Sequence, residues 1–460
     1  MNILLVLAIA VPFIGSSLNI GYGCVINSPQ AVIRDWIQAT LVDRYGLHMT
    51  VGQEVMLWAI IVAIFQVGAI IGVVPGTALA DRIGRRWAFF FNHILVLIGS
   101  ILIMICKSVH LVEFFVLGRF ILGIAAGIAD SLVPVYLTEV VPPIYGGVLG
   151  VVHTVGIFSG IVISQIVSMD VLLGTAELWP YLGAATAGFA IFAMSLHPFL
   201  TESPSFIFFI QKDGERGRNI LSRLRKDKDL IEEEAIKMEK EAKGLELNQK
   251  EEQNYSIRNV LATKDLRMPL FMVLLLFSTH QLSGINGCLF YSNIIFTTAG
   301  LSQRYSEIAS ICGTTLGTLM YLASIPMMNN FGRRPLLLSS IGGCIICLIS
   351  LIVSLKLIPI YEAASYTSMV SFLFIYICWT FGLGSVPYVT TCELIPAQPR
   401  PAIMSLGIAA SRSSSLLVGI CHPIIQNAIG EYSLLFSVGV CLFAGIFFFF
   451  KLPETYCKKH

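Results

Sequence analysis

Charged side chains are scarce in this 460-residue chain. Asp, Glu, Lys and Arg make up 13% of it, whereas soluble proteins carry about a quarter. The formal net charge is only +2 and there is no basic block, which argues against a nucleic-acid partner. The chain also lacks a Gly-rich phosphate loop, a catalytic triad and any Cys/His spacing typical of zinc, so it predicts no enzyme, metal or cofactor.

Hydrophobic residues dominate instead, at 55% of the chain. A helix needs about 20 apolar residues to cross a bilayer, and runs of that length recur throughout. The first begins almost at Met1 without a basic leader, so we predict a retained span and not a cleaved signal. Twelve membrane-spanning helices are predicted, at residues 4–26, 54–77, 88–107, 111–133, 146–168, 178–200, 268–292, 305–328, 335–356, 366–390, 402–424 and 432–451.

One long polar segment, residues 201–267, separates the sixth and seventh spans and contains 14 of the 30 Lys and Arg residues. Lys and Arg are enriched in cytoplasmic loops, so this segment and both termini are predicted to be cytoplasmic. Opposite charges at helical spacing, such as Glu233 and Lys237, indicate solvated helices within it.

Three short segments recur in the second half of the chain at a nearly constant offset. Asp81–Arg86 matches Phe331–Arg334, Tyr136–Glu139 matches Tyr388–Glu393, and Thr201–Pro204 matches Pro453–Thr455. A duplicated six-helix unit explains the pattern, and such halves enclose a substrate site near the bilayer midplane. The predicted organisation is an N-terminal half at 1–200, a cytoplasmic helical linker at 201–267, a C-terminal half at 268–451 and a short cytoplasmic tail at 452–460.

A series of motifs gives the most specific signal in the chain. In order, they are Gly21-Tyr22 with Val25–Gln30, Gly118–Phe120, Val133–Tyr136, Gln281–Asn286, Val386-Pro387 and Pro399–Ala402. Together they resemble the sugar porter branch of the major facilitator superfamily, most closely the animal facilitative glucose transporters, over almost the whole chain. The resemblance implies an all-α membrane protein of two pseudo-symmetric six-helix halves with a small-molecule substrate.

A sugar site needs amides for paired hydrogen bonds and aromatic rings for the flat face of the sugar. Gln281 and Asn286 retain amides of the family's site, although polar residues in spans also hold helices together. Gln281–Ser283 resembles the motif of the glucose-preferring class. The family's other contact positions are altered and fall here at Thr154, His280, Thr380, Tyr388, Ser411 and Arg412.

Charged residues recur at the inner ends of helices in both halves. Ion pairs there can hold the cytoplasmic side closed and release it when the two halves rock against each other. The alternative is that Arg and Lys at these positions only set the orientation of the chain in the membrane. The predicted inner gate comprises Arg85, Arg86, Glu139, Glu202, Arg333, Arg334, Glu393, Arg400 and Glu454, and the resemblance places an outer gate at Tyr291. Charged residues of the family are replaced at Gly146, Asn329, Asn330 and Ser205, so we expect a less firmly locked inner gate.

Arg412 is predicted to lie well inside the eleventh span, where a charge is costly and suggests a function. No acid is expected at the same depth, because Asp130 and Glu393 are both expected near the inner ends of their spans. Two interpretations remain open. Either Arg412 extends to the inner face and pairs with Glu393 or another gate acid, or it faces the cavity and favours an anion.

The sequence therefore predicts facilitated diffusion of a hexose, or a related polar solute, by alternating access at the plasma membrane. Proton-driven relatives carry an Asp in the first span, where this chain has Gly21–Cys24. The alternatives are a carrier of another, anionic solute and a non-transporting sugar sensor. Sensors of this fold carry long cytoplasmic tails, which this sequence does not show, and the short termini also fit a truncated chain. The oligomeric state is not predicted.

Overall fold

A computed structural model describes residues 3–24, 26, 29–142, 146–225, 227, 231–240, 260, 263–288, 296, 300, 302–358, 360–361, 363–395 and 399–454. All regular structure in these ranges is helical. Ten helices among them are long and apolar enough to span a membrane, and Val151–Val167 is a shorter apolar helix. Large apolar side chains such as Ile346, Phe443 and Phe450 are exposed on the outside, as expected for contact with lipid.

Helices account for most of the described part of each of the first six predicted spans. The first span is α1 (Ile3–Pro12), a π-helical turn η1 (Phe13–Leu18) and α2 (Asn19–Cys24), and α3 (Gln30–Tyr45) follows it. The next four are α4 (Val51–Ile83), α5 (Arg85–Ile105), α6 (Val112–Val140) and α7 (Gly146–Val167). The sixth is α8 (Leu182–Leu196), flanked by 3-10 turns η3 (Trp179–Tyr181) and η4 (His197–Phe199).

The polar segment begins with the π-helical η5 (Phe206–Gln211) and α9 (Gly214–Leu224), and residues 231–240 are also helical. The later spans begin with α12 (Lys264–Leu282), α14 (Gln303–Phe331) and α15 (Arg333–Leu357). The tenth span is α16 (Ala363–Trp379), η6 (Thr380–Gly384) and α17 (Val386–Leu394). The last two are α18 (Arg400–Ile429) and, after the turn η7 (Gly430–Leu434), α19 (Leu435–Lys451).

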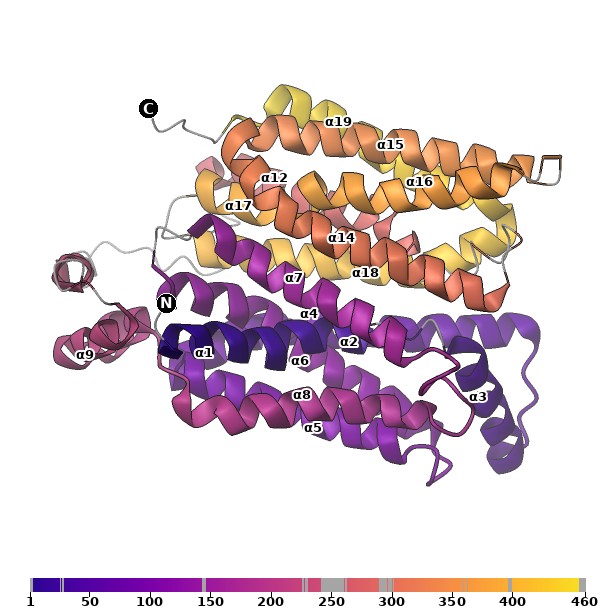
Figure 1. Cartoon of the computed structure of the whole chain (residues 1–460), viewed down its shortest axis with the longest axis horizontal. Coiled ribbons are helices and arrows are strands. Elements are labelled where there is room, and N and C mark those ends of the chain that lie inside the picture. Colours follow the sequence, from indigo (N-terminus) through magenta and orange to yellow (C-terminus); the bar gives the residue numbers. More distant parts are fainter. Residues whose placement is uncertain are drawn as a thin grey trace.

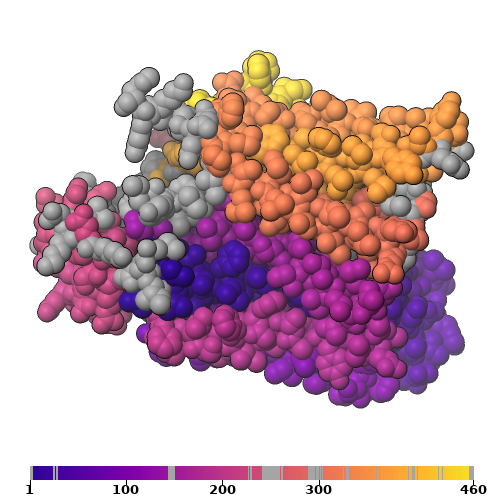
Figure 2. All heavy atoms as spheres, viewed as in Figure 1, coloured from indigo at the N-terminus to yellow at the C-terminus, as the bar shows by residue number. Residues whose placement is uncertain are grey.

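The helices before the polar segment and those after it occupy different sides of the molecule (Figure 1). The largest groups of buried apolar side chains follow the same division, except that Val151, Phe158 and Ile161 of α7 pack with the later helices. Contacts between the sides run mainly from α4 to α18 and from α7 to α14. Figure 2 shows the magenta surface of α7 meeting the orange surface of α14 on one face of the molecule.

The end of α6 differs from the prediction. The predicted fourth span stops at residue 133, before Pro134, but α6 continues to Val140. Proline removes one helical hydrogen bond, yet Val133, Tyr136 and Val140 around it are fully buried, so packing outweighs that loss. Asp130 therefore lies ten residues before the helix end, about 15 Å along the axis, and not next to that end.

Glycine lets α4 and α6 approach each other closely. A Cβ on Gly127 of α6 would lie 2.0 Å from the carbonyl oxygen of Ala69, and one on Gly72 of α4 would lie 2.2 Å from that of Ile124. No larger residue fits at such separations, which is the usual reason for small residues between membrane helices. The contact packs α4, which carries Gln66, against α6, which carries Asp130.

Candidate functional site

A cavity lies between the earlier and the later helices and contains about 790 Å³ of empty space, counting the part open to solvent. Its described lining comes from α2, α4, α6 and α7 on one side and from α12, α14, α16, α17 and α18 on the other. Seven of the eight residues predicted for the substrate site line it: Thr154, His280, Gln281, Asn286, Tyr388, Ser411 and Arg412.

Thr380 is the predicted residue that does not line the cavity. Its side chain is fully buried, and its hydroxyl donates a hydrogen bond of 2.6 Å to the carbonyl oxygen of Tyr376 in the preceding turn. The Thr380 hydroxyl therefore bonds within its own helix. The aromatic ring of Trp379, one residue earlier, lines the cavity in its place.

Gln281 and Asn286 meet because the seventh span is interrupted. In a continuous helix, residues five apart point in different directions, but α12 ends at Leu282 and Gly284 adopts a positive φ of 95°. After this turn, Asn286 Nδ2 donates to Gln281 Oε1 at 2.6 Å. Gln281 Nε2 in turn donates to Ser411 Oγ at 2.8 Å, so the two amides and a hydroxyl form one cluster.

Aromatic rings form another part of the wall. Phe158 of α7 lies 5.0 Å from Tyr321 and 5.7 Å from Trp379, measured between ring centroids. The indole Nε1 of Trp379 donates to the carbonyl oxygen of His280 at 2.9 Å, which fixes the orientation of its ring. The cavity thus combines hydrogen-bonding amides with apolar ring faces, the two features that a sugar requires.

Arg412 contradicts the prediction that it has no acid at its depth. Its Nε donates to Asp130 Oδ2 at 2.6 Å, and its Nη2 contacts the same oxygen. Pairing with Glu393 at the inner face is also wrong, because Glu393 instead accepts from Arg333 at 2.9 Å. Arg412 faces the cavity, as the second interpretation held, but its charge is balanced by Asp130.

Further polar side chains surround the pair. His153 Nε2 lies 3.5 Å from Asp130 Oδ1, and His153 Nδ1 is 2.8 Å from the hydroxyl of Ser17. On the other side, Arg412 Nη1 donates to Gln66 Oε1 at 3.4 Å. The ion pair therefore joins α6 to α18, and its neighbours come from η1, α4 and α7.

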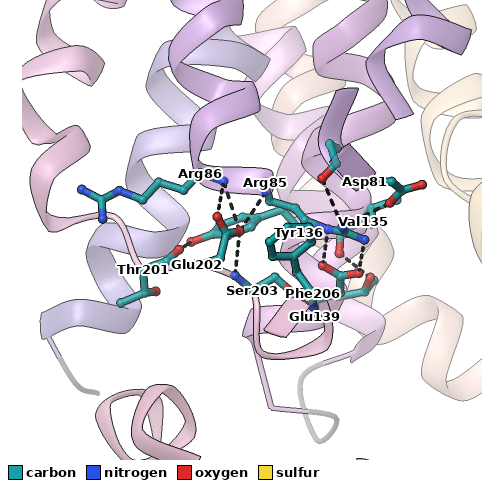
Figure 3. Close-up of polar contacts among 12 residues, drawn as sticks. Asp81, Arg85, Arg86, Val135, Tyr136, Glu139, Thr201, Glu202, Ser203 and Phe206 are labelled. Atoms are coloured by element: carbon teal, nitrogen blue, oxygen red, sulfur yellow. Dashed lines mark hydrogen bonds and ion pairs between the residues drawn. The ribbon is translucent and has the colours of Figure 1, made fainter. Parts of the chain in front are cut away.

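The first set of predicted inner-gate residues lies at the ends of α5, α6 and α8 (Figure 3). Both oxygens of Glu139 accept from the Arg85 guanidinium, each at 3.0 Å. Glu202 accepts from the backbone N–H groups of Arg85 and Arg86, at 2.8 and 3.2 Å, and so caps the start of α5. Burial raises the pKa of Glu202 despite these bonds.

The second set repeats this geometry at the start of α15. Arg333 pairs with Glu393, and Glu454 accepts from the backbone N–H groups of Arg333 and Arg334, at 3.0 and 3.2 Å. The guanidinium of Arg400 donates to the carbonyl oxygen of Ile395, the residue that follows α17. These contacts join helices of the same side of the molecule. Tyr291, predicted for the outer gate, lies outside the described residues.

Six polar or aromatic residues of the cavity wall were not among the predicted site residues: Gln66, Asp130, Phe158, Tyr321, Trp379 and Ser415. Gln66 and Asp130 carried a usable signal, since a lone amide or acid inside an apolar run needs a buried partner. Asp130 was expected near the inner end of its span, whereas it lies about 15 Å from the end of α6. Gln66 and Trp379 were not singled out at all.

Comparison with solved structures gives the class of fold. The proton:xylose symporter XylE bound to 6-bromo-6-deoxy-D-glucose superposes with a TM-score of 0.81 at 20% identity, covering 98% of this chain and 96% of that one. The xylose transporter XylE from E. coli in a partially occluded inward-open conformation gives 0.78 at 20% identity, covering 99% of each. The protein has the major facilitator fold, and the predicted all-α architecture of twelve spans is confirmed.

Comparison of sequences gives the family. The family described as sugar (and other) transporter matches residues 8–460. Facilitated glucose transporter member 3 of solute carrier family 2 from Mus musculus is 32% identical over 452 residues, 98% of this chain and 90% of that protein. Member 14 from Homo sapiens is 32% identical over 452 residues, 98% of this chain and 85% of that protein. The chain belongs to the sugar (and other) transporter family, as the motifs predicted.

Proposed function

We propose that this protein carries a hexose, of the glucose type, across the membrane by facilitated diffusion with alternating access. The observation that carries the proposal is the cavity, where Gln281, Asn286 and Ser411 form a polar cluster beside aromatic rings. The related proteins named facilitated glucose transporters support the choice of solute. No covalent step is involved, since the solute only has to bind and leave.

Alternating access requires contacts between the two sides that can break and form again. Side chains where α7 meets α14 supply such contacts. Thr314 of α14 donates to Gln165 of α7 at 2.6 Å, and Phe158 of α7 packs on Tyr321 of α14. A rocking motion of one side against the other would exchange these contacts for solvent on one face and then on the opposite face.

We expect Gln281→Ala and Asn286→Ala each to weaken hexose binding by about 1–3 kcal/mol, or roughly 5- to 150-fold in Kd. Each substitution removes one amide and also leaves the other without the partner that orients it. The measurement is the binding of labelled D-glucose to purified protein. Thr279→Val is the matched control, because the Thr279 hydroxyl lies on the same helix and bonds only within it, to the Leu275 carbonyl oxygen at 2.7 Å. Unchanged affinity in both alanine variants would show that the two amides hold helices together and do not bind the solute.

Transport is expected to be uncoupled from protons. In proton-driven relatives an Asp occupies the first span, whereas the matching stretch of this chain contains no acid. The guanidinium of the buried Arg119 instead donates to the backbone carbonyl oxygen of Gly23 in that stretch, and it lies 4.9 Å from the ring centre of Phe65. An inward proton gradient imposed on proteoliposomes should therefore drive no accumulation of D-glucose above the external concentration. Accumulation that disappears when the gradient is collapsed would contradict uniport, and Asp130 would then be the first acid to substitute.

The orientation follows from the charge of the polar segment. With residues 201–267 in the cytoplasm, the Arg85–Glu139 and Arg333–Glu393 pairs lie at the cytoplasmic face of a protein of the plasma membrane. An epitope tag inserted after Asp213, in the exposed turn before α9, should be labelled only after cells are permeabilised. Labelling of that tag on intact cells would reverse the orientation.

A further inference from the structure

We propose that Asp130 and Arg412 set the charge selectivity of the cavity. Asp130 cancels the charge of Arg412, so that the cavity accepts uncharged solutes and rejects both anions and cations. The inference rests on the proposed function, and it names the charge class of the substrate. It also decides between the hexose and the anion that the sequence alone left open.

The position of the pair makes it accessible to a solute. Asp130 and Arg412 both line the cavity, and Arg412 directly follows Ser411, whose hydroxyl bonds to the Gln281 amide. A solute held by that amide cluster therefore lies beside the pair. Both side chains are largely buried, with 8% and 12% of their surface exposed, so bulk water screens them little.

The charge balance of the lining leads to the same conclusion. Among the described lining residues, Asp130 and Arg412 are the only Asp, Glu, Lys or Arg, and their charges sum to zero. His280 also lines the cavity, and His153 contacts Asp130 from behind. A solute carboxylate at Arg412 would have to share the guanidinium with Asp130, which would place two anions side by side in a largely buried site.

The surroundings of the pair also oppose its opening by a charged solute. Arg412 places two nitrogens on Oδ2 of Asp130, while His153 holds the other oxygen and Gln66 contacts Arg412. Splitting the pair would disturb all four side chains. A hexose needs no such rearrangement, because its hydroxyls can donate to the carboxylate and accept from the guanidinium while the pair stays closed.

Three solutes of similar shape and different charge test this inference: D-glucose, the anion D-glucuronate, and D-glucosamine at a pH where its amine is protonated. Uptake into proteoliposomes and the shift in Tm caused by each solute are measured for wild type, Asp130→Asn, Arg412→Gln and the double variant. Lys356→Gln is the control, since it removes a charge from the exposed pair with Glu431 at 2.9 Å, away from the cavity.

Wild type should prefer glucose to both charged solutes. Asp130→Asn leaves Arg412 unbalanced and should raise the glucuronate-to-glucose ratio by about tenfold or more, whereas Arg412→Gln should raise the glucosamine-to-glucose ratio by a similar factor. The double variant restores neutrality and should return to the wild-type order, and Lys356→Gln should not depart from it.

Unchanged ratios in both folded single variants would overturn the inference and reduce the pair to a tie between α6 and α18, leaving the proposed function intact. If a single variant does not fold, the other decides. If neither folds, the wild type decides, because preference for either charged solute over glucose contradicts charge balance. The converse outcome is a protein that fails to carry glucose while each single variant gains uptake of the charged solute expected for it. That result would support the inference and refute the proposed hexose.

Discussion

Replacing Arg412 by methionine is expected to lower the free energy of unfolding by about 3–5 kcal/mol, because Asp130 would remain buried without its main charge partner. Asp130 is only 8% exposed, so its carboxylate would stay largely buried after the partner is removed. The double variant Asp130→Leu with Arg412→Met should recover most of the loss, since an apolar pair of similar volume avoids the cost of burying charge.

The measurement is unfolding in mixed detergent micelles, followed by circular dichroism for wild type, both single variants and the double variant. The double-mutant cycle isolates the coupling between the two side chains. A double variant as unstable as the sum of the two single variants would show that Asp130 and Arg412 act independently, against the geometry of the pair.

Gly127→Val should destabilise the protein by about 3 kcal/mol, the upper end of the usual cost of overpacking. A Cβ at this position would lie 2.0 Å from the carbonyl oxygen of Ala69, and backbone cannot move aside as a side chain can. Because Gly127 lies one helical turn before Asp130, forcing α4 and α6 apart should also displace Asp130 from Arg412 and reduce glucose uptake.

Gly188→Val is the matched control for this substitution. Gly188 lies in the membrane-spanning α8, and a Cβ there would meet no atom within 4 Å. Its melting temperature in detergent and its uptake rate should equal those of wild type. Equal melting temperatures for the Gly127 and Gly188 variants would mean that α4 and α6 are not packed as closely as described.

Hydropathy predicted the helices well because a membrane span has one dominant requirement, about 20 apolar residues in a row. The positions within a span were harder to predict, as Asp130 and Arg412 show. Their separation in the sequence is large, and α6 continues through Pro134 beyond the predicted end of its span, where Val133 and Tyr136 are buried. Hydropathy alone does not indicate that two lone charges in different spans lie at the same depth.

The candidate site shows a similar contrast. The motif predicted that Gln281 and Asn286 belong to one site, and Gly284 supplies the turn that brings the two side chains together. Alignment with a family position failed for Thr380, whose hydroxyl bonds to its own helix. The aromatic wall at Trp379 was missed, since an indole in an apolar run looks like any other core residue until its neighbours are known.

The most direct test of the central claim is counterflow. Proteoliposomes loaded with unlabelled D-glucose are diluted into a trace of labelled D-glucose, with no pH gradient across the membrane. A facilitative hexose carrier should concentrate the label inside transiently and then release it, and Gln281→Ala should weaken this overshoot. Entry of label no faster than into protein-free liposomes, in a preparation whose circular dichroism shows a folded protein, would contradict hexose transport by this chain.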